Sequence, residues 1–286
     1  MTVKEYIDTG IERLLLLYPT EEARALLCRV ADFFCGIPAH SYYVDPNLLL
    51  PDASLPDLQK ALDELLRSRP IQYVLGETFF EGCTLKVSED VLIPRPETEE
   101  LVRWAKSLLS GAGSVLDLCT GSGAIAISLA KAFPQAEVYG IDICEEALEI
   151  AQENNGLNKV EVHFIKADVL QPPDLLAFSV LSHPFDLIIS NPPYVRFSEK
   201  LLMRANVLEY EPHQALFVPD DDPLLFYRAL ADWGALLLKE GGILMTEINE
   251  QMGQEVKQLL INKGYLSVKI REDLNNKPRM CYAVKS

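Results

Sequence analysis

The segment "IISNPPYV" ends an apolar run with an asparagine, two prolines and a tyrosine. Proline has no backbone N–H to donate and restricts the residue before it, so we expect a strand to end at Asn191. The same residues can also hold a substrate. The side-chain oxygen of Asn191 and the carbonyl oxygen of Pro192 can each accept a hydrogen bond from one NH₂ group, and Tyr194 can stack on the planar group that carries it. Pro193 stiffens the backbone and adds no competing donor.

An amide or nucleobase NH₂ is a poor nucleophile, because its lone pair is delocalised into the adjacent π system. Two acceptors on one such nitrogen aim its lone pair at an electrophile and favour pyramidalisation. This is catalysis by positioning and by stabilisation of charge. No general base is required before attack, because the nitrogen becomes acidic only as the new bond forms. The residues alone predict a strand stop at Asn191, and they are compatible with a site for a planar NH₂ group.

A second segment, "VLDLCTGSGAIAISLA", predicts a strand, a tight glycine turn and a helix. Gly121 and Gly123 lack a Cβ, so the turn can be sharp and a ligand can approach the backbone. The N-terminus of the following helix offers free N–H groups. The pattern Gly121-x-Gly123-x-x-Ala126 also fits the dinucleotide-binding fingerprint with alanine in the third place. A glycine-rich turn without a ligand remains an alternative for this segment alone.

Two aspartates end the next two predicted strands. Asp142 follows the glycines by about 20 residues, the spacing of an acidic ribose ligand. Its carboxylate can accept from both ribose hydroxyls of an adenosyl group, whether the cofactor is NAD or S-adenosylmethionine; it can also cap the helix that follows. Asp168 is placed to accept from an adenine amino group, and a turn or cap role is its alternative.

A parallel sheet would bring these strand ends together, and the sequence predicts one. Strand-like and helix-like segments alternate through the second part of the chain, which indicates a largely parallel sheet covered on both faces. Only "LNNKP" separates the last two strands, so we expect an antiparallel hairpin that gives the sheet one reversed edge strand. The expected strands are "SVLDLCT", "AEVYGIDI", "VEVHFIKADV", "FDLIISN", "GGILMTEI", "YLSVKIRED" and "RMCYAVKS".

Three regions follow from the change of pattern along the chain. Residues 1–75 predict a small helical bundle, because apolar residues recur at three- and four-residue spacing. Residues 76–93 are β-branched and aromatic around two glycines and predict a linker with short strands. Residues 94–286 predict the α/β domain. The bundle carries no chemical motif, so packing or the docking of a partner is its expected role.

Composition excludes several classes of function. The formal net charge of −16 lacks the basic footprint of most nucleic-acid-binding proteins. Six cysteines without a C-x-x-C pair and four scattered histidines predict neither disulfides nor a metal site. No apolar run approaches the ~20 residues that a bilayer span requires, and the first residues do not resemble a signal peptide. We therefore expect a cytoplasmic protein that contacts neither membrane nor nucleic acid.

The strand-terminal N-P-P-Y resembles the signature of S-adenosylmethionine-dependent methyltransferases that modify the planar NH₂ of an amide or a nucleobase. Hydride-transferring Rossmann enzymes do not carry it. From about Arg69 to the C-terminus the chain resembles the release-factor glutamine methyltransferase family, also called HemK or PrmC. The motifs that carry this resemblance, in order, are "RPIQYVLGETFF", "VLIPRPETEELV", "VLDLCTGSGAIAISLA", "NPPYV", "YEPHQALFV" and "REDLNNKPRM".

The resemblance implies a Rossmann-like class I methyltransferase domain, preceded by a small helical domain that grips the substrate protein. It implies N5-methylation of the glutamine in the Gly-Gly-Gln motif of class 1 peptide chain release factors, by a monomer that uses S-adenosyl-L-methionine. Asn191, Pro192 and Tyr194 would be catalytic, and these three with Pro193 would bind the glutamine, with Phe79 or Phe80 walling its pocket. The implied cofactor-binding residues are Cys119, Thr120, Gly121, Ser122, Gly123, Asp142, Asp168 and Asn191.

Two positions depart from the family pattern. Cys119 stands where the family usually has glycine, so its backbone conformation must tolerate a Cβ; a reactive thiol is the alternative. Asn276 stands where glycine is frequent, and asparagine is the residue that best replaces glycine at positive φ. Two other functions remain open. One is an adenine-N6 or guanine-N2 methyltransferase acting on DNA or RNA, and the other is a binding protein that keeps the fold without catalysis.

Overall fold

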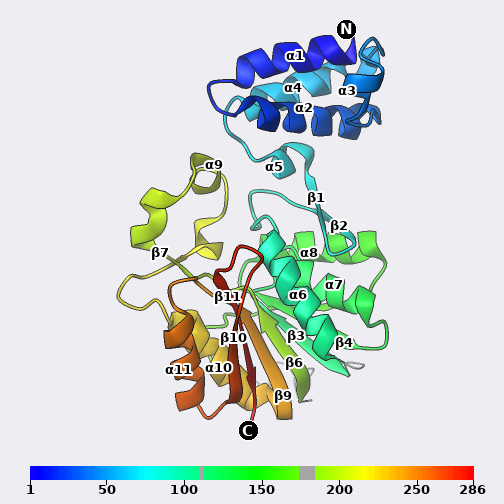
Figure 1. Cartoon of the computed structure of the whole chain (residues 1–286). Helices are drawn as coiled ribbons and strands as arrows, with labels where there is room; N and C mark the ends of the chain where they lie inside the picture. Colours follow the sequence, from blue (N-terminus) through cyan, green and yellow to red (C-terminus); the bar gives the residue numbers. More distant parts are fainter. Residues whose placement is uncertain (110–112, 174–183) are drawn as a thin grey trace. The chain divides into compact units, whose positions relative to one another are not determined.

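A computed structural model describes residues 1–109, 113–173 and 184–286 (Figure 1). The chain divides into two compact units. One comprises residues 1–77 together with residues 204–210, and the other comprises residues 78–203 and 211–286. Residues 204–210, which the sequence predicts to be part of the α/β domain, group with the N-terminal helices in the structure.

The N-terminal unit is helical. Thr2 caps its first helix in a capping box with Glu5, and the second helix ends at Gly36, which takes the left-handed conformation with φ +63°. The Tyr210 hydroxyl donates to the Arg67 carbonyl at 2.7 Å and so holds the 204–210 segment to this unit. Its helices are α1 (Val3–Leu14), α2 (Thr20–Cys35), α3 (Ser41–Val44), the 3₁₀ helix η1 (Asp52–Ser54), α4 (Leu55–Leu65), α5 (Ile71–Leu75) and α9 (Ala205–Leu208).

The second unit is built on a seven-stranded sheet, and its strands fall where the alternation of the sequence predicts them. The strands are β3 (Ser114–Leu118), β4 (Glu137–Asp142), β5 (His163–Lys166), β6 (Phe185–Ser190), β9 (Leu238–Glu247), β10 (Leu266–Glu272) and β11 (Pro278–Val284). Their order is β10-β11-β9-β6-β3-β4-β5. The pairs among β9, β6, β3, β4 and β5 are parallel, which confirms a mostly parallel sheet.

The reversed strand is not at the edge, so that part of the prediction was wrong. β11 runs antiparallel to both of its neighbours, β9 and β10, and β10 forms the edge. The crossover from β9 through α11 (Gly253–Asn262) leads to β10, two strand positions away. The hairpin then brings β11 back into the slot between them.

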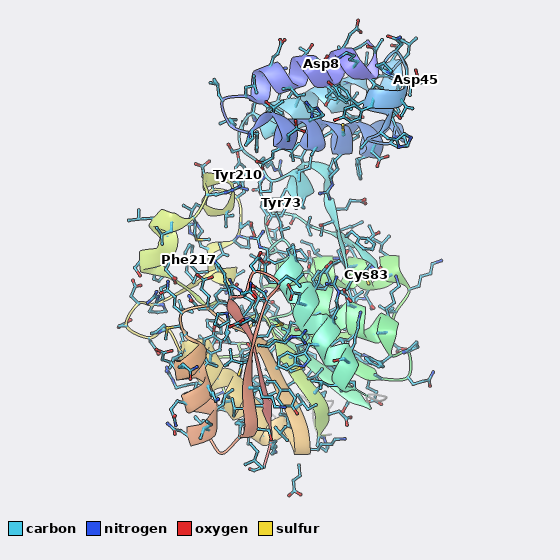
Figure 2. The ribbon with its side chains drawn as sticks, in the orientation of Figure 1. Asp8, Asp45, Tyr73, Cys83, Tyr210 and Phe217 are labelled. Atoms are coloured by element: carbon cyan, nitrogen blue, oxygen red, sulfur yellow. The ribbon has the colours of Figure 1, made fainter. Side chains whose placement is uncertain are left out.

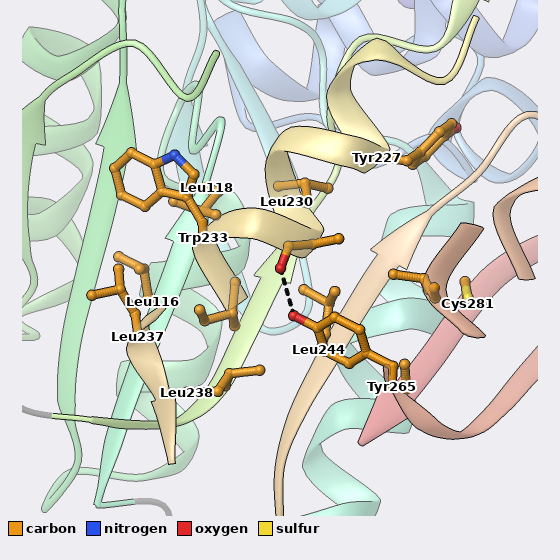
Figure 3. Close-up of a cluster of buried hydrophobic side chains, with 14 of the residues drawn as sticks. Leu116, Leu118, Tyr227, Leu230, Trp233, Leu237, Leu238, Leu244, Tyr265 and Cys281 are labelled. Carbon is orange, nitrogen blue, oxygen red and sulfur yellow. Dashed lines mark hydrogen bonds between the residues drawn. The ribbon is translucent and has the colours of Figure 1, made fainter. Parts of the chain in front are cut away.

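Helices cover both faces of this sheet (Figure 1). On one face lie α6 (Pro96–Leu108), α7 (Ala124–Ala132) and α8 (Glu145–Asn158), and on the other α10 (Leu225–Leu237) and α11. Figure 3 shows the core under α10, where Trp233 is fully buried and the Tyr265 hydroxyl donates to the Ala231 carbonyl at 2.8 Å. Both faces of the sheet are therefore buried.

Short elements complete this region. The predicted strands around Gly82 form the pair β1 (Glu77–Phe80) and β2 (Cys83–Lys86). Cys83 at the start of β2, labelled in Figure 2, is fully buried. The buried side chain of Asn154 ties β2 to the glycine turn, because it donates to the carbonyls of Lys86 and Ser122. Beyond the sheet lie β7 (Val195–Arg196), η3 (Phe197–Leu202), η4 (His213–Ala215) and β8 (Phe217–Val218). Within the described ranges, no helix is long and apolar enough to cross a membrane.

Candidate active site

The site lies where the strand order reverses. The chain runs from β3 outward to β5 on one side, and β6 then lies on the other side of β3. In register, Leu118 at the end of β3 opposes Ser190 at the end of β6, and the Ser190 hydroxyl donates to the Leu118 carbonyl at 2.6 Å. The glycine turn and Asn191 therefore begin side by side. Open α/β sheets bind ligands at such a point, outside the carboxyl ends of the strands.

A cavity of about 510 Å³ opens there. Most of the residues singled out from the sequence line it: Cys119, Thr120, Gly121, Ser122, Asp142, Asp168, Asn191 and Pro193. Gly123, Pro192 and Tyr194 are outside the lining, as are Phe79 and Phe80. Phe80 is buried in the core between α6 and α7, and Phe79 is exposed, so neither walls this cavity. The fold thus brings the glycine turn, both aspartates and the asparagine to one space.

The glycine turn has the conformation that its sequence requires. Gly121 and Gly123 have φ of +54° and +80°. A Cβ on Gly123 would also lie 3.2 Å from the Ala151 side chain, so glycine is needed there for close packing of α7 and α8. The buried carboxylate of Asp117 supports the turn from below, since it accepts from the Thr120 hydroxyl at 2.6 Å and from the Ala126 N–H. Asp117 is not among the residues predicted from the sequence, although an acidic residue inside an apolar strand indicates a buried polar contact.

Cys119 has φ +61°, a conformation that usually belongs to glycine. Its backbone therefore accepts a Cβ in the left-handed region. Burial, together with the nearby carboxylates of Asp142 and Asp117, raises the pKa of the Cys119 thiol well above its ordinary value. The thiol stays protonated and is a poor nucleophile. Tolerance of the side chain, and not reactivity, is the reading that the structure favours.

Asp142 is held by the backbone on both sides. Its Oδ2 accepts from the Gly121 N–H at 2.8 Å and its Oδ1 accepts from the Cys144 N–H at 3.0 Å. The helix α8 begins at Glu145, after Cys144, so Asp142 is not its N-cap. Burial raises the pKa of Asp142, and the backbone N–H donors oppose that rise. Each oxygen keeps a second lone pair with which to accept from a ligand hydroxyl.

Asp168 takes the turn role that the sequence left open. Its Oδ1 accepts from the Leu170 N–H at 2.9 Å, and its carbonyl accepts from the Gln171 N–H. The side chain still lines the cavity. With Asp90 and Asp142 it gives the described lining three carboxylates, and no lysine or arginine is among those residues.

Asn191 stands at one end of a series of side-chain hydrogen bonds. Its Nδ2 donates to the Thr98 hydroxyl at 3.1 Å, and that hydroxyl donates to Oε2 of Glu247 at 2.6 Å. The other carboxylate oxygen of Glu247 accepts from the Tyr194 hydroxyl at 2.7 Å. Within the described residues, Oδ1 of Asn191 has no hydrogen-bond donor, so it is available to a ligand. Tyr194 is fixed by this bond and by packing against the core of the α10 face.

Glu247 is fully buried at the end of β9. Burial raises its pKa, whereas the hydrogen bonds from Thr98 and Tyr194 and the charge of Arg279 lower it. Thr98 and Glu247 are not among the residues predicted from the sequence. Both lie in quoted segments, "VLIPRPETEELV" and "GGILMTEI", but nothing in either segment states that they meet.

A second group of missed residues comes from the segment "YEPHQALFV". Glu211 is buried and binds Arg95 at 2.6 Å, which joins this segment to the start of α6. The pair β7–β8 joins it to the residues after Tyr194. Phe217, labelled in Figure 2, stacks on Phe197 with ring centroids 5.5 Å apart, and both rings line the cavity. One wall of the cavity is therefore aromatic.

The structure also shows the turn at Asn276 and the groups that could bind a metal. Asn276 has φ +59° and its N–H donates to the Asp273 carbonyl, so the turn that usually contains glycine survives. In the part of the chain that the structure describes, no group of three or more potential ligands could hold a metal ion.

Comparison with known proteins identifies the family. A family model described as a methyltransferase domain matches residues 109–277, more than half of the chain. A release factor glutamine methyltransferase of Flavobacterium psychrophilum is 40% identical over 285 residues, 98% of each chain. The chain belongs to the release factor glutamine methyltransferase family. A second family member, from Bacteroides thetaiotaomicron, is 41% identical over 93% of this chain and 94% of its own length.

Solved structures show the same fold as the methyltransferase domain of this family member. A methyltransferase from Pyrococcus furiosus has a TM-score of 0.53 at 21% identity, covering 72% of this chain and 90% of its own. A Thermus thermophilus 16S rRNA guanine-N2 methyltransferase, solved with AdoMet and guanosine, has a TM-score of 0.52 at 19% identity. It covers 73% of this chain and 50% of its own. At such identities the likeness concerns the fold alone.

Proposed function

We propose that this protein transfers a methyl group from S-adenosyl-L-methionine to the side-chain amide nitrogen of the glutamine in the Gly-Gly-Gln motif of class 1 release factors. The observation that carries the proposal is the position of Asn191. Its side chain lines the same cavity as Asp142 and the glycine turn, with Oδ1 free to accept a hydrogen bond. Membership of the release factor glutamine methyltransferase family supports the choice of substrate.

The residues of the cavity fit this cofactor. Asp142 would accept from the ribose hydroxyls, Asp168 from the adenine amino group, and the turn from Cys119 to Gly123 would contact the adenosyl group through its backbone. Three lining carboxylates suit a cation with a free amino group and would repel the pyrophosphate of a dinucleotide. S-Adenosyl-L-methionine, when bound, supplies an electrophilic methyl group that already bears positive charge on sulfur.

The protein's own contribution is to hold the acceptor nitrogen. Oδ1 of Asn191 and the carbonyl of Pro192 would each accept one N–H of the glutamine amide, which turns its lone pair toward the methyl donor. Both acceptors become more favourable as positive charge develops on that nitrogen, so they stabilise the transition state more than the ground state. The aromatic wall of Phe197 and Phe217 would exclude water from one side.

Tyr194 takes a different part from the stacking that its sequence suggests. Its hydroxyl is bonded to Glu247 and its ring lies outside the cavity lining. We propose that it supports Asn191 from behind, while Pro193, which lines the cavity, faces the substrate side. The helical unit would hold the release factor away from the chemistry, and we propose a monomer that acts in the cytoplasm, where its substrate is. Light scattering on the purified protein would test the monomer.

The experiment offers methyl-labelled S-adenosyl-L-methionine with a purified class 1 release factor, DNA and ribosomal RNA in parallel. We expect label on the release factor alone. The nucleobase methyltransferase alternative predicts label on a nucleic acid, and that result would overturn the proposal. The nucleobase methyltransferase alternative is less well supported than the release-factor proposal, because a net charge of −16 repels a phosphate backbone.

A variant separates catalysis from binding. Asn191→Ala should abolish methyl transfer and leave release-factor binding intact, because Asn191 is a small part of a large contact. Asn262→Ala, on the exposed surface of α11, is the matched control and should keep full activity. Undiminished turnover by Asn191→Ala would sink the assignment, and loss of transfer by both variants would show that the assay does not report on the site.

A further inference from the structure

A carboxylate is buried behind Asn191 without touching the cavity. Glu247 is 1% exposed and Thr98 is 4% exposed. Burying a carboxylate costs several kcal/mol unless hydrogen bonds compensate it, and an apolar residue of similar size is usually the more stable choice. Its presence here therefore calls for a role other than stability.

The sheet brings Glu247 to this place. Ser190 at the end of β6 opposes Thr246 of β9, so Asn191 and Glu247 each stand one step beyond that pair on neighbouring parallel strands. Thr98, in the first turn of α6, lies between them and contacts both through one hydroxyl. These hydrogen bonds thus link two separate elements, α6 and β9, to the strand end that holds the candidate catalytic asparagine.

The donors and acceptors of these side chains fix the direction of each hydrogen bond in the series. The Thr98 hydroxyl has one proton, and it donates that proton to Oε2 of Glu247. That hydroxyl oxygen then has only lone pairs to offer Asn191, so the NH₂ end of the Asn191 amide must face Thr98. The carbonyl end is left to face the cavity. The reverse orientation would point an NH₂ group at the substrate NH₂, where two donors repel each other.

We propose that Thr98 and Glu247 are positioning residues that hold the Asn191 amide with Oδ1 toward the acceptor nitrogen of the substrate. This inference rests on the proposed function, because an acceptor is required there only if the substrate presents an N–H donor. Tyr194 belongs to the same assembly, since its hydroxyl occupies the second oxygen of Glu247 and keeps the carboxylate from turning away from Thr98. Neither Thr98 nor Glu247 needs to touch the reacting atoms to control them.

The first test removes only the hydroxyl of Thr98. Thr98→Val keeps the shape of the side chain but has no donor or acceptor, whereas Thr98→Ser keeps the hydroxyl. We expect kcat for the release factor to fall about 10- to 100-fold in Thr98→Val, the loss typical of a misplaced catalytic group, with KM changed less than about threefold. Thr98→Ser should restore most of kcat.

Thr246, the residue before Glu247 on β9, provides a matched control. The Thr246 hydroxyl is equally buried and donates to the backbone carbonyl of Glu247, not to the side-chain assembly. Thr246→Val should therefore lose stability without a comparable loss of kcat. Equal kcat losses in Thr98→Val and Thr246→Val would reduce Thr98 to a structural role and overturn the inference.

The second test reads the amide directly, without turnover. In protein carrying ¹⁵N in its asparagine side chains, the Asn191 NH₂ signal is assigned as the one that disappears in Asn191→Ala. We expect that signal to shift in Thr98→Val and in Glu247→Gln, where the amide of glutamine can donate to Thr98 and reverse the direction of the series. An unchanged Asn191 signal in both variants would contradict the inference.

The two proposals fail in different ways. If the wild-type protein does not methylate the release factor at all, the proposed function is wrong, while the ¹⁵N signals still report on the amide orientation. If the wild type is active and Thr98→Val keeps its kcat, the proposed function stands and the positioning role of Thr98 and Glu247 is wrong.

Discussion

Replacing Asp142 with asparagine is the substitution whose effect on the cofactor can be worked out most fully. In the structure, Oδ2 accepts from Gly121 and Oδ1 from Cys144, which leaves one lone pair on each oxygen for a ribose hydroxyl. Asparagine has one oxygen and an NH₂ group that cannot accept. Asp142→Asn therefore loses one of the two ribose bonds together with its charge.

The magnitude follows from the strength of a hydrogen bond to a charged group. Such a bond contributes about 1.5–3 kcal/mol, which corresponds to a dissociation constant raised roughly 10- to 150-fold. In Asp142→Asn one backbone N–H also loses its acceptor, but it loses it both in the free and in the ligand-bound protein. This loss therefore lowers the stability of the fold and leaves the ligand affinity unchanged. The loss of affinity should thus come from the ribose contact alone.

Isothermal titration calorimetry with S-adenosyl-L-methionine measures this loss. Asp186→Asn is the matched control, because the Asp186 carboxylate also accepts from two backbone N–H groups, those of Gly113 and Ser114, but at the amino end of β6. It should lose stability and keep the wild-type dissociation constant. A dissociation constant for Asp142→Asn within about twofold of wild type, well below the change expected for one such bond, would refute the ribose role.

Three further predictions concern the scaffold. Burial raises the pKa of Asp117 to about 7, so the folded state binds this proton more tightly than the unfolded state does. The unfolding free energy of the wild type, measured by urea titration relative to that of Asp117→Asn, should therefore fall by about 4 kcal/mol between pH 4 and pH 8. A pH-independent difference would contradict that value. Cys119→Gly should leave cofactor affinity unchanged in calorimetry and alter stability by less than about 1 kcal/mol, because relief of the positive φ offsets the extra entropy of unfolded glycine. Gly234→Ala should destabilise the fold by about 1–3 kcal/mol, since the added Cβ would lie 2.2 Å from the Tyr265 hydroxyl, whereas Gly156→Ala in the open part of α8 should not.

Much of the fold was predictable because strands of a sheet buried on both faces are continuous apolar runs, and those runs stand out between the helices. The same rule placed Asp142 and Asn191 at strand ends, and the structure confirms both positions. The place of β11 was not predictable in this way. A hairpin between β10 and β11 is local, but the pattern of a strand does not encode that β10 leaves one strand position open and that β11 fills it.

The support of Asn191 could not be predicted from the sequence for a related reason. Thr98 and Glu247 are 149 residues apart, and only the packing of α6 against the end of β9 brings them together. Glu247 also ends a strand in a sequence with many surface glutamates, so its type gave no sign of burial. Tertiary contacts, which a strand or helix pattern does not encode, decided which polar residues belong to the site.

The position of the added methyl group tests the central claim most directly. A class 1 release factor treated with the enzyme and S-adenosyl-L-methionine would be digested and sequenced by tandem mass spectrometry. We expect one methyl group on the side-chain nitrogen of the Gly-Gly-Gln glutamine, and none when Asn191→Ala replaces the wild-type enzyme. A methyl group on any other residue, or an unmodified release factor beside a methylated nucleic acid, would contradict the account.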